Sequence, residues 1–330
     1  MAKGYDFLVF IGRFEPFHQG HYYVVEQALK KASKVIILIG SANAPRTIKN
    51  PFNFDERALM IKQSFDHDER LICVPIDDDV YNDEKWLKNI QVAVGAVVGD
   101  TPNHKIALIG HNKDTSSYYL SLFPQWQFER LPNFEGLSAT PMRRRYFLEG
   151  VIDDHLPKPS AELLQRFLGT DTYARLKNDY QHIIAYGQAW QQAPYAPVFV
   201  TADALVVQAG HVLLVERGGA YGQGLLALAG GFLNQDETLF DCAVRELFEE
   251  TGLVVNKTAL KASQTFDAPE RSLRGRTITT VFYFELCGTT LPPVMGKDDA
   301  KRAFWLPLSK LDGKQMFEDH ESIIKKMLGL

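Results

Sequence analysis

The pattern of apolar residues changes once along this chain of 330 residues, and the change predicts two domains. In the first half, short apolar runs alternate with segments of helical spacing. In the second half, strand-like runs surround one helix. The change falls at QQAPYAP, residues 191–197, whose two prolines are incompatible with a continuing helix. We therefore expect one domain over residues 1–187, a linker over 188–197 and a second domain over 198–330.

The first half contains five apolar runs that indicate buried strands, the last of them weaker than the others. They are residues 7–11, 35–39, 71–76, 105–109 and the segment WQFERL around Gln127. Helical spacing over residues 22–31 and 56–64 lies between them. Strand–helix alternation of this kind predicts an α/β fold with a doubly wound parallel sheet. Residues 160–190 then predict further helices.

The second half has a different order of predicted strands and helices. Residues 204–217, ALVVQAGHVLLVER, predict a hairpin that turns at 209–211. A helix is expected near residues 237–251, followed by strands in ITTVFYFEL and AFWLPL. This order predicts an α+β domain.

Composition narrows the classes of function. The net charge of −4 disfavours a general nucleic-acid binder and predicts that any phosphate binding is local. Three cysteines without CxxC spacing favour a reducing compartment. No apolar run approaches the roughly 18 residues that span a bilayer, and the N-terminus lacks the layout of a signal peptide. We therefore expect a soluble, cytoplasmic protein that acts on neither nucleic acid nor membranes, and the sequence leaves a homo-oligomer open.

Polar segments follow the predicted strands of the first half, where ligands bind in open parallel sheets. His18 and His21 are three residues apart at a helix start, so both imidazoles can face one anion site. Further on, Thr140 is the expected N-cap and Pro141 the first residue of a helix that ends at Gly150. Arg143 then lies in the first turn, beside Ser138 and Thr140. The alternatives are two surface histidines and a plain capped helix.

Together the two segments resemble the HxGH and SxTxxR elements of the nucleotidyltransferase superfamily. Here these elements read His18-Gln19-Gly20-His21 and Ser138-Ala139-Thr140-Pro141-Met142-Arg143, and the resemblance covers roughly residues 1–185. Within the superfamily, the resemblance is greatest to archaeal-type NMN (nicotinamide mononucleotide) adenylyltransferases. The segment GRFEPFH at the end of the first strand and the segments around Arg46, Asn50, Trp86 and Lys113 support it.

The resemblance implies a Rossmann-like fold and in-line transfer of AMP from ATP to NMN, which gives NAD and pyrophosphate with Mg²⁺. It implies that His18, His21 and Arg143 act on the ATP phosphates. Trp86 either stacks on the nicotinamide ring or belongs to the core. Lys113 either contacts substrate or forms a surface ion pair. The implied substrate-binding residues are Gly12, Arg13, Phe14, Arg46, Asn50, Trp86, Lys113, Ser138 and Thr140.

In the second half, Glu246, Glu249 and Glu250 share one helix face because they are spaced i, i+3, i+4. Such charges repel unless a divalent cation or solvent compensates them, so the alternatives are a metal site and a solvated acidic face. The longer pattern fills every defined position of the Nudix box, and residues 198–330 resemble that family. The box comprises Gly231, Glu237, Arg245, Glu246, Glu249, Glu250 and Gly252.

The Nudix resemblance implies that the three glutamates bind Mg²⁺ or Mn²⁺, with Glu249 or Glu250 also serving as base. It implies that Arg245 and Glu237 support them. Arg274 and Arg276 lie in a segment similar to that of ADP-ribose-directed members, with a basic hairpin loop as the alternative.

The fused arrangement resembles bacterial bifunctional NMN adenylyltransferase/Nudix proteins. It predicts an enzyme that makes NAD and hydrolyses ADP-ribose to AMP and ribose 5-phosphate. An adenylyltransferase with another acceptor and an ADP-ribose-sensing Nudix half are the rival hypotheses.

Overall fold

The computed structural model describes residues 4–99, 103–110, 122–132, 134 and 136–330. Its contacts divide the chain into two compact units, Met1–Lys177 and Asn178–Leu330. The division falls inside helix α6 (Asp171–Ala189), so the second part of this helix packs with the second unit. The predicted linker over 188–197 begins within the last two residues of that helix, and the assignment of domains to residues 1–187 and 198–330 stays a prediction.

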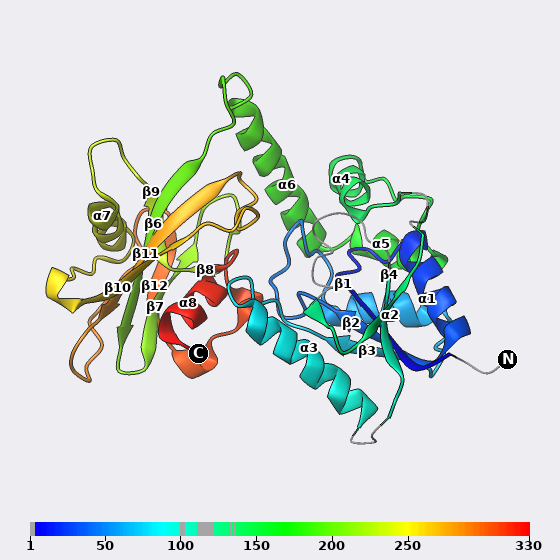
Figure 1. The fold of residues 1–330 in the computed structure, drawn as a ribbon. Helices are drawn as coiled ribbons and strands as arrows, with labels where there is room; N and C mark the ends of the chain where they lie inside the picture. Colours follow the sequence, from blue (N-terminus) through cyan, green and yellow to red (C-terminus); the bar gives the residue numbers. More distant parts are fainter. Residues whose placement is uncertain (1–3, 100–102, 111–121, 133, 135) are drawn as a thin grey trace. The chain divides into compact units, whose positions relative to one another are not determined.

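The first unit is built on a parallel sheet, as predicted. Its strands lie in the order β3-β2-β1-β4-β5, with β1 in the centre, so the chain winds outward twice from the middle (Figure 1). Every pair in the sheet is parallel. The strands are β1 (Tyr5–Gly12), β2 (Ala32–Ile39), β3 (Leu71–Pro75), β4 (Ile106–Gly110) and β5 (Gln127–Arg130).

Helices cover this sheet, and most of them lie where the spacing predicts. They are α1 (Gln19–Lys31), α2 (Phe54–Ser64), α3 (Asp83–Val98), α4 (Ala139–Glu149), α5 (Lys158–Phe167) and α6. Helix α3 is an addition, because the sequence analysis names no helix over these residues. It buries Ile90 and Val94 against Val9 and Leu108 of the sheet.

Helix α4 begins earlier than predicted. Its N-cap is Ser138, which makes no side-chain capping bond, so the prediction of Thr140 as N-cap is wrong. Pro141 is tolerated as the third residue of the helix, because the N–H groups of the first turn have no partner within the helix. The predicted end at Gly150 is confirmed, with a φ of 72° that glycine adopts readily.

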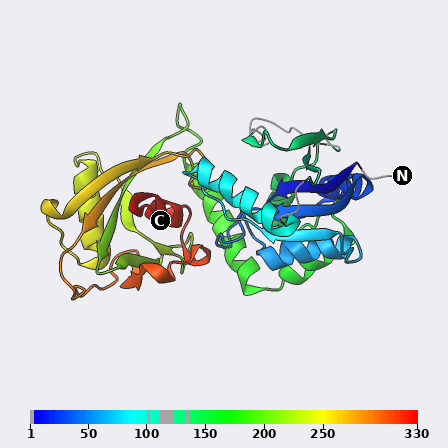
Figure 2. The same ribbon diagram turned by 60° about the horizontal axis from the view of Figure 1, so that its bottom comes forward.

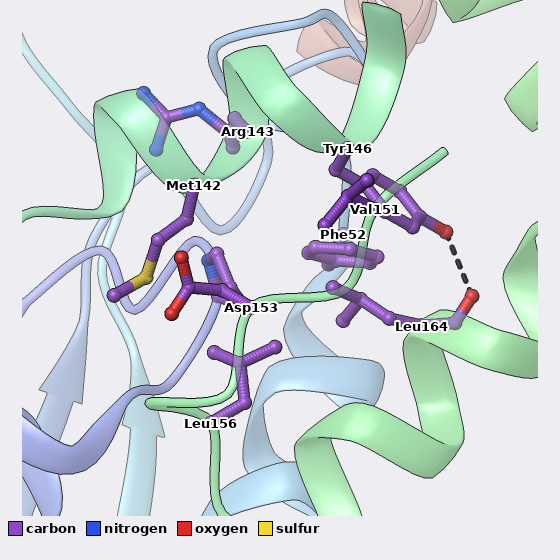
Figure 3. A pocket seen from close by; sticks show the side chains of 9 residues that line it. Phe52, Met142, Arg143, Tyr146, Val151, Asp153, Leu156 and Leu164 are labelled. Atoms are coloured by element: carbon purple, nitrogen blue, oxygen red, sulfur yellow. Dashed lines mark hydrogen bonds between the residues drawn. The ribbon is translucent and has the colours of Figure 1, made fainter. Parts of the chain in front are cut away.

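A small cavity lies between α4 and α5. It has a volume of about 10 Å³, room for about one water molecule, and its lining is mainly apolar. Figure 3 shows Phe52 beside Tyr146, whose hydroxyl donates to the Leu164 carbonyl oxygen at 2.7 Å. The cavity is too small for a nucleotide and belongs to the packing of α4 on α5.

The second unit is an α+β domain, as predicted. One path through its mixed sheet runs β10-β11-β6-β7-β12, with β8 paired to β7 and β9 to β6. Among these pairs only β11 and β6 run parallel. The strands are β6 (Phe199–Gln208), β7 (His211–Arg217), β8 (Leu226–Ala227), β9 (Ala229–Phe232), β10 (Leu260–Phe266), β11 (Thr277–Glu285) and β12 (Ala300–Pro307).

Helices α7 (Leu239–Thr251) and α8 (His320–Leu328) lie on opposite sides of this sheet (Figure 2). Helix α7 matches the predicted helix closely. Thr238 caps it by accepting from the Asp241 N–H, and Gly252 ends it with a φ of 72°. Its buried face, including Ala243 and Leu247, packs on β6 and β9. Across the described ranges, no helix is long and apolar enough to span a bilayer.

Candidate active sites

The loops at the carboxyl ends of β1 and β2 in the first unit are held together by one side chain, Arg57 of α2. Its guanidinium is buried, with 1% of its side chain exposed. It donates to three loop carbonyl oxygens: Arg13 at 2.8 Å, Gly40 at 2.7 Å and Ser41 at 3.2 Å. Its Nε donates to the Asn53 carbonyl oxygen at 3.2 Å. Two strand-end loops and the start of α2 are therefore joined through one residue.

Glu15 compensates the charge of Arg57. Its Oε1 lies 3.2 Å from the Arg57 Nε, and its Oε2 accepts from the Phe52 N–H at 3.1 Å. Burial raises the pKa of this carboxyl group, and the nearby Arg57 guanidinium opposes that rise. The Glu15 carbonyl oxygen accepts from Arg143 Nη1 at 2.6 Å. Arg143 also donates to the Ile48 carbonyl oxygen at 3.1 Å, so the N-terminal part of α4 is bound to both loops.

His18 and His21 lie in contact at the start of α1. Their rings stack with centroids 3.7 Å apart and an angle of 22° between the planes. The Gly20 N–H donates to His18 Nδ1, and the His18 N–H donates to His21 Nδ1. Because each Nδ1 accepts a backbone hydrogen, the proton of each neutral imidazole sits on Nε2. The backbone hydrogen bonds therefore leave Nε2–H of each ring as a hydrogen-bond donor.

Other predicted residues of the first unit occupy the same end of the sheet. The Phe14 ring is buried and packs edge-on against His21, with centroids 5.0 Å apart. Gly12 is required beneath it, since a Cβ there would approach the Phe14 ring to 2.9 Å. Arg13 is exposed. Arg46 already binds the Pro51 carbonyl oxygen and Glu56, which holds it beside α2.

The remaining predicted residues have different surroundings, and one of them lies outside the described residues. Asn50 has a buried side-chain oxygen that accepts no hydrogen bond among the described residues. Trp86 is partly buried against Phe123, with ring centroids 6.3 Å apart, so it borders the core. Ser138 and Thr140 lie at the start of α4. Lys113 lies outside the described residues.

In the second unit, Arg245 joins the carboxylates of the Nudix box. It donates to Glu237 at 2.7 and 2.9 Å, and to Glu246 and Glu249 at 2.8 Å each. The hydrogen bonds from Arg245 are the largest cause of the low pKa of the Glu237 carboxyl group, which is about 2. It also donates to the Phe232 carbonyl oxygen at 3.3 Å, which ties α7 to the end of β9.

Glu246 and Glu250 project from α7 toward β9. The Gly230 N–H donates to Glu250 at 3.1 Å. A Cβ on Gly231 would lie 2.3 Å from the Glu246 carboxylate, so glycine is needed for this approach. Burial raises the pKa of both carboxyl groups, that of Glu250 to about 8, and the proximity of Glu246 adds to the rise at Glu250.

The donor set of α7 fits a divalent cation. Glu246, Glu249 and Glu250 offer hard carboxylate oxygens, and the buried Glu250 and partly buried Glu246 carry the desolvation cost that a bound cation removes. In the part of the chain that the structure describes, no three acidic, histidine or cysteine side chains already enclose a metal position. Arg245 instead holds Glu246 and Glu249.

The two arginines predicted outside the box differ. Arg276 donates to the Asp267 carbonyl oxygen at 2.5 Å, which fixes it along its own loop. The Arg274 guanidinium lies 5.3 Å from the centre of the Phe232 ring, next to the box. Sequence reasoning missed Arg57 and Glu15 in the first unit, and Arg217 and Phe317 beside Arg274 in the second. Burial of a charge has no signature in a single sequence.

Known proteins match both units. Residues 9–145 match the family model described as cytidylyltransferase-like, and residues 197–327 match that of the NUDIX domain. Over 180 residues the chain is 42% identical to the nicotinamide/nicotinic acid mononucleotide adenylyltransferase of Acinetobacter baylyi, covering 54% of this chain and 94% of that one. Over 126 residues it is 35% identical to the ADP-ribose pyrophosphatase of Methanocaldococcus jannaschii, covering 38% of this chain and 70% of that one.

One solved structure matches the whole chain. It is a bifunctional NMN adenylyltransferase/ADP ribose pyrophosphatase from Francisella tularensis, with a TM-score of 0.93 and 37% identity, covering 98% of this chain and 99% of that one. The chain belongs to this bifunctional NMN adenylyltransferase/ADP-ribose pyrophosphatase family. A second structure of the Francisella protein, complexed with AMP and a manganese ion, gives a TM-score of 0.92 at 36% identity. Membership of the bifunctional family confirms the predicted pairing of a nucleotidyltransferase with a Nudix domain.

Replacing Arg57 by Met tests the connection between the loops. It leaves Glu15 buried without its partner, so we expect the free energy of opening β1 and β2 to fall by about 3–5 kcal/mol. Hydrogen exchange at the amides of these strands measures this locally. The control is Lys30→Met, which removes an exposed ion pair with Glu26 and should cost at most about 1 kcal/mol. Equal exchange in both variants would contradict the assigned role.

Proposed function

We propose that this chain catalyses two reactions of NAD metabolism. In the first unit it transfers AMP from ATP to NMN, which gives NAD and pyrophosphate. In the second it hydrolyses ADP-ribose to AMP and ribose 5-phosphate. The Acinetobacter, Methanocaldococcus and Francisella relatives carry these activities in their names. The observation that carries the proposal is the pair of constellations: the stacked imidazoles of His18 and His21 with Arg143 bonded to the Glu15 carbonyl oxygen in one unit, and the glutamates held by Arg245 in the other.

The first reaction needs charge stabilisation more than covalent chemistry. The phosphate of NMN attacks the α-phosphorus of ATP in line, and pyrophosphate leaves. We assign the Nε2–H groups of His18 and His21 to the phosphate oxygens that gain charge in the transition state. We assign Arg143, which the Glu15 and Ile48 carbonyl oxygens fix in place, to further phosphate oxygens. Mg²⁺ bound to ATP would neutralise further phosphate charge.

The second reaction is the attack of water on the diphosphate. We assign Glu246, Glu249 and Glu250 as ligands of Mg²⁺ or Mn²⁺, and Glu249 or Glu250 also as the base. The bound cation supplies activation of water and screening of the diphosphate. Arg245 is a positioning residue, because it bonds to Glu246 and Glu249 without needing to touch substrate. Glu237 in turn orients Arg245 through two hydrogen bonds.

Two substitutions separate the activities. His21→Asn removes an imidazole donor, so we expect NAD formation to fall by about 100-fold or more while ADP-ribose hydrolysis is kept. Glu249→Gln removes a carboxylate of α7, so we expect the reverse pattern. Chromatography of the products measures both in each variant, and each variant is the folding control of the other. Loss of both activities in either variant would contradict two separate sites.

The rival hypotheses give other results in the same assays. If the wild-type chain leaves NMN unused but adenylylates another phosphate acceptor in a panel, the acceptor assigned to the first unit is wrong. If the wild-type chain binds ADP-ribose saturably without turnover, the second unit is a sensor.

Gly231→Ala tests the placement of Glu246. The added Cβ displaces a flexible carboxylate end, so we expect ADP-ribose turnover to fall by about 10- to 100-fold with little change in stability. Gly219→Ala is the matched control, since its Cβ meets no atom within 4 Å. Turnover and thermal unfolding of the purified variants are compared. If both variants turn over ADP-ribose like the wild type, the close approach of Gly231 to Glu246 does not matter for catalysis.

A further inference from the structure

Ser41 of the first unit has a backbone conformation that few residues other than glycine adopt. It lies two residues after the end of β2 and has a φ of 51°, in the left-handed region. Ser41 is also buried. A residue of this kind keeps such a conformation only where the surrounding contacts enforce it, and such residues concentrate at functional sites. The contacts of Ser41 therefore indicate which side chains set the shape of the loop after β2.

The side chain that binds Ser41 is Asp78, in the loop after β3. Asp78 Oδ1 accepts from the Ser41 N–H at 3.2 Å, and Asp78 Oδ2 accepts from the Ser41 hydroxyl. Hydrogen bonds to an ionised carboxylate are stronger than those between neutral groups. Because the two oxygens bind the backbone and the side chain of the same residue, Asp78 fixes both parts of Ser41 together.

The other side of Ser41 is bonded as well. Its carbonyl oxygen accepts from Arg57 Nη2 at 3.2 Å and from the Ala44 N–H at 3.3 Å, which closes a turn over residues 41–44. The next residue, Ala42, donates its N–H to the Ile76 carbonyl oxygen at 3.0 Å. The loop after β2 is therefore bonded to the loop after β3 through Asp78 and through the backbone of Ile76.

Asp78 also contributes charge at this end of the sheet. Burial lowers the pKa of Arg57, and the negative charges of Glu15 and Asp78 oppose that change. Asp78 itself is exposed, so its carboxylate remains solvated. A Cβ on Gly40 would lie 3.6 Å from Asp78 Oδ1 and 3.8 Å from Arg13 Cγ, so both side chains approach this glycine. Asp78 is thus near Arg13, one of the predicted substrate-binding residues.

We propose that Asp78 is a positioning residue for adenylyl transfer, because it keeps Ser41 in the left-handed conformation and thereby fixes the loop that carries Arg46 and Asn50. The turn over residues 41–44 leads directly to Arg46, whose side chain donates to the Pro51 carbonyl oxygen and to Glu56. A displacement of about 1 Å in such a loop can slow a reaction by about 100-fold. The inference rests on the proposed adenylyl transfer by the first unit.

The test is Asp78→Ala in the full chain, assayed for NAD formation from ATP and NMN with Mg²⁺. Loss of both bonds to Ser41 should lower kcat/KM by about 10- to 100-fold. Asp77→Ala is the matched control, because Asp77 is an exposed aspartate one residue earlier in the same loop. A kcat/KM in Asp78→Ala within about twofold of that in Asp77→Ala would overturn the proposal.

A second substitution separates positioning from direct contact with substrate. Glycine adopts a φ of 51° without strain, so adding Ser41→Gly to Asp78→Ala should restore kcat/KM by at least about fivefold. No recovery overturns the proposal, since a glycine at position 41 cannot replace a carboxylate that binds substrate. If Asp78→Ala lowers the melting temperature, Asp78→Asn is measured instead. Its amide can accept from the Ser41 N–H and donate to the hydroxyl, so kcat/KM should stay within about fivefold of the wild type. A larger loss overturns the proposal.

If the wild-type chain forms no NAD, the proposed function fails by itself, and hydrogen exchange then decides the inference. The amides of Ala42 and Ala44 are bonded to the carbonyl oxygens of Ile76 and Ser41, so both should be protected. Faster exchange at these amides in Asp78→Ala than in Asp77→Ala supports the positioning of the loop by Asp78. Equal exchange in the two variants overturns it.

Discussion

The buried ion pair between Glu15 and Arg57 is the interaction on which the first site depends. Loops at the ends of parallel strands have backbone groups without strand partners, and such groups must be satisfied where they are buried. Arg57 satisfies three loop carbonyl oxygens at once, and Glu15 lets its charge remain in the interior. With these loops fixed, Arg143 binds the carbonyl oxygen of Glu15, and the chain between Glu15 and α1 presents His18 and His21.

Arginine side chains also join separate segments in the second unit, where their partners are carboxylates instead of backbone carbonyl oxygens. Arg245 gathers the carboxylates of Glu237, Glu246 and Glu249, and Arg271 anchors the C-terminal segment through Asp319. The first unit thus collects donors for phosphate, whereas the second collects oxygen ligands for a cation. Both solutions use the rigid, five-donor guanidinium, which can bond to several segments in a fixed geometry.

The sequence predicted most of the architecture, because the elements that carry it have strong periodicity or capping signals. The five parallel strands, the hairpin with Ala209 and Gly210 at its turn, and the helix from Thr238 to Gly252 follow from local pattern. The motifs of both sites were visible because their spacing is fixed within one element. Thr140 was misplaced as N-cap because Ser138, two residues earlier, is an equally good cap by type. Strand β10, polar and exposed along one edge, offers no such signal. The role of Arg57 depends on contacts with loops 16 to 44 residues away in sequence, and Arg217 contacts a ring 100 residues away; no local pattern encodes either.

The central claim is that one chain carries two independent active sites. The most direct test is a single preparation of the wild-type chain with Mg²⁺, divided between ATP with NMN and ADP-ribose alone. The account predicts NAD and pyrophosphate in the first sample, and AMP with ribose 5-phosphate in the second. A preparation that forms the products of one reaction and leaves the other substrate unchanged and unbound would contradict it.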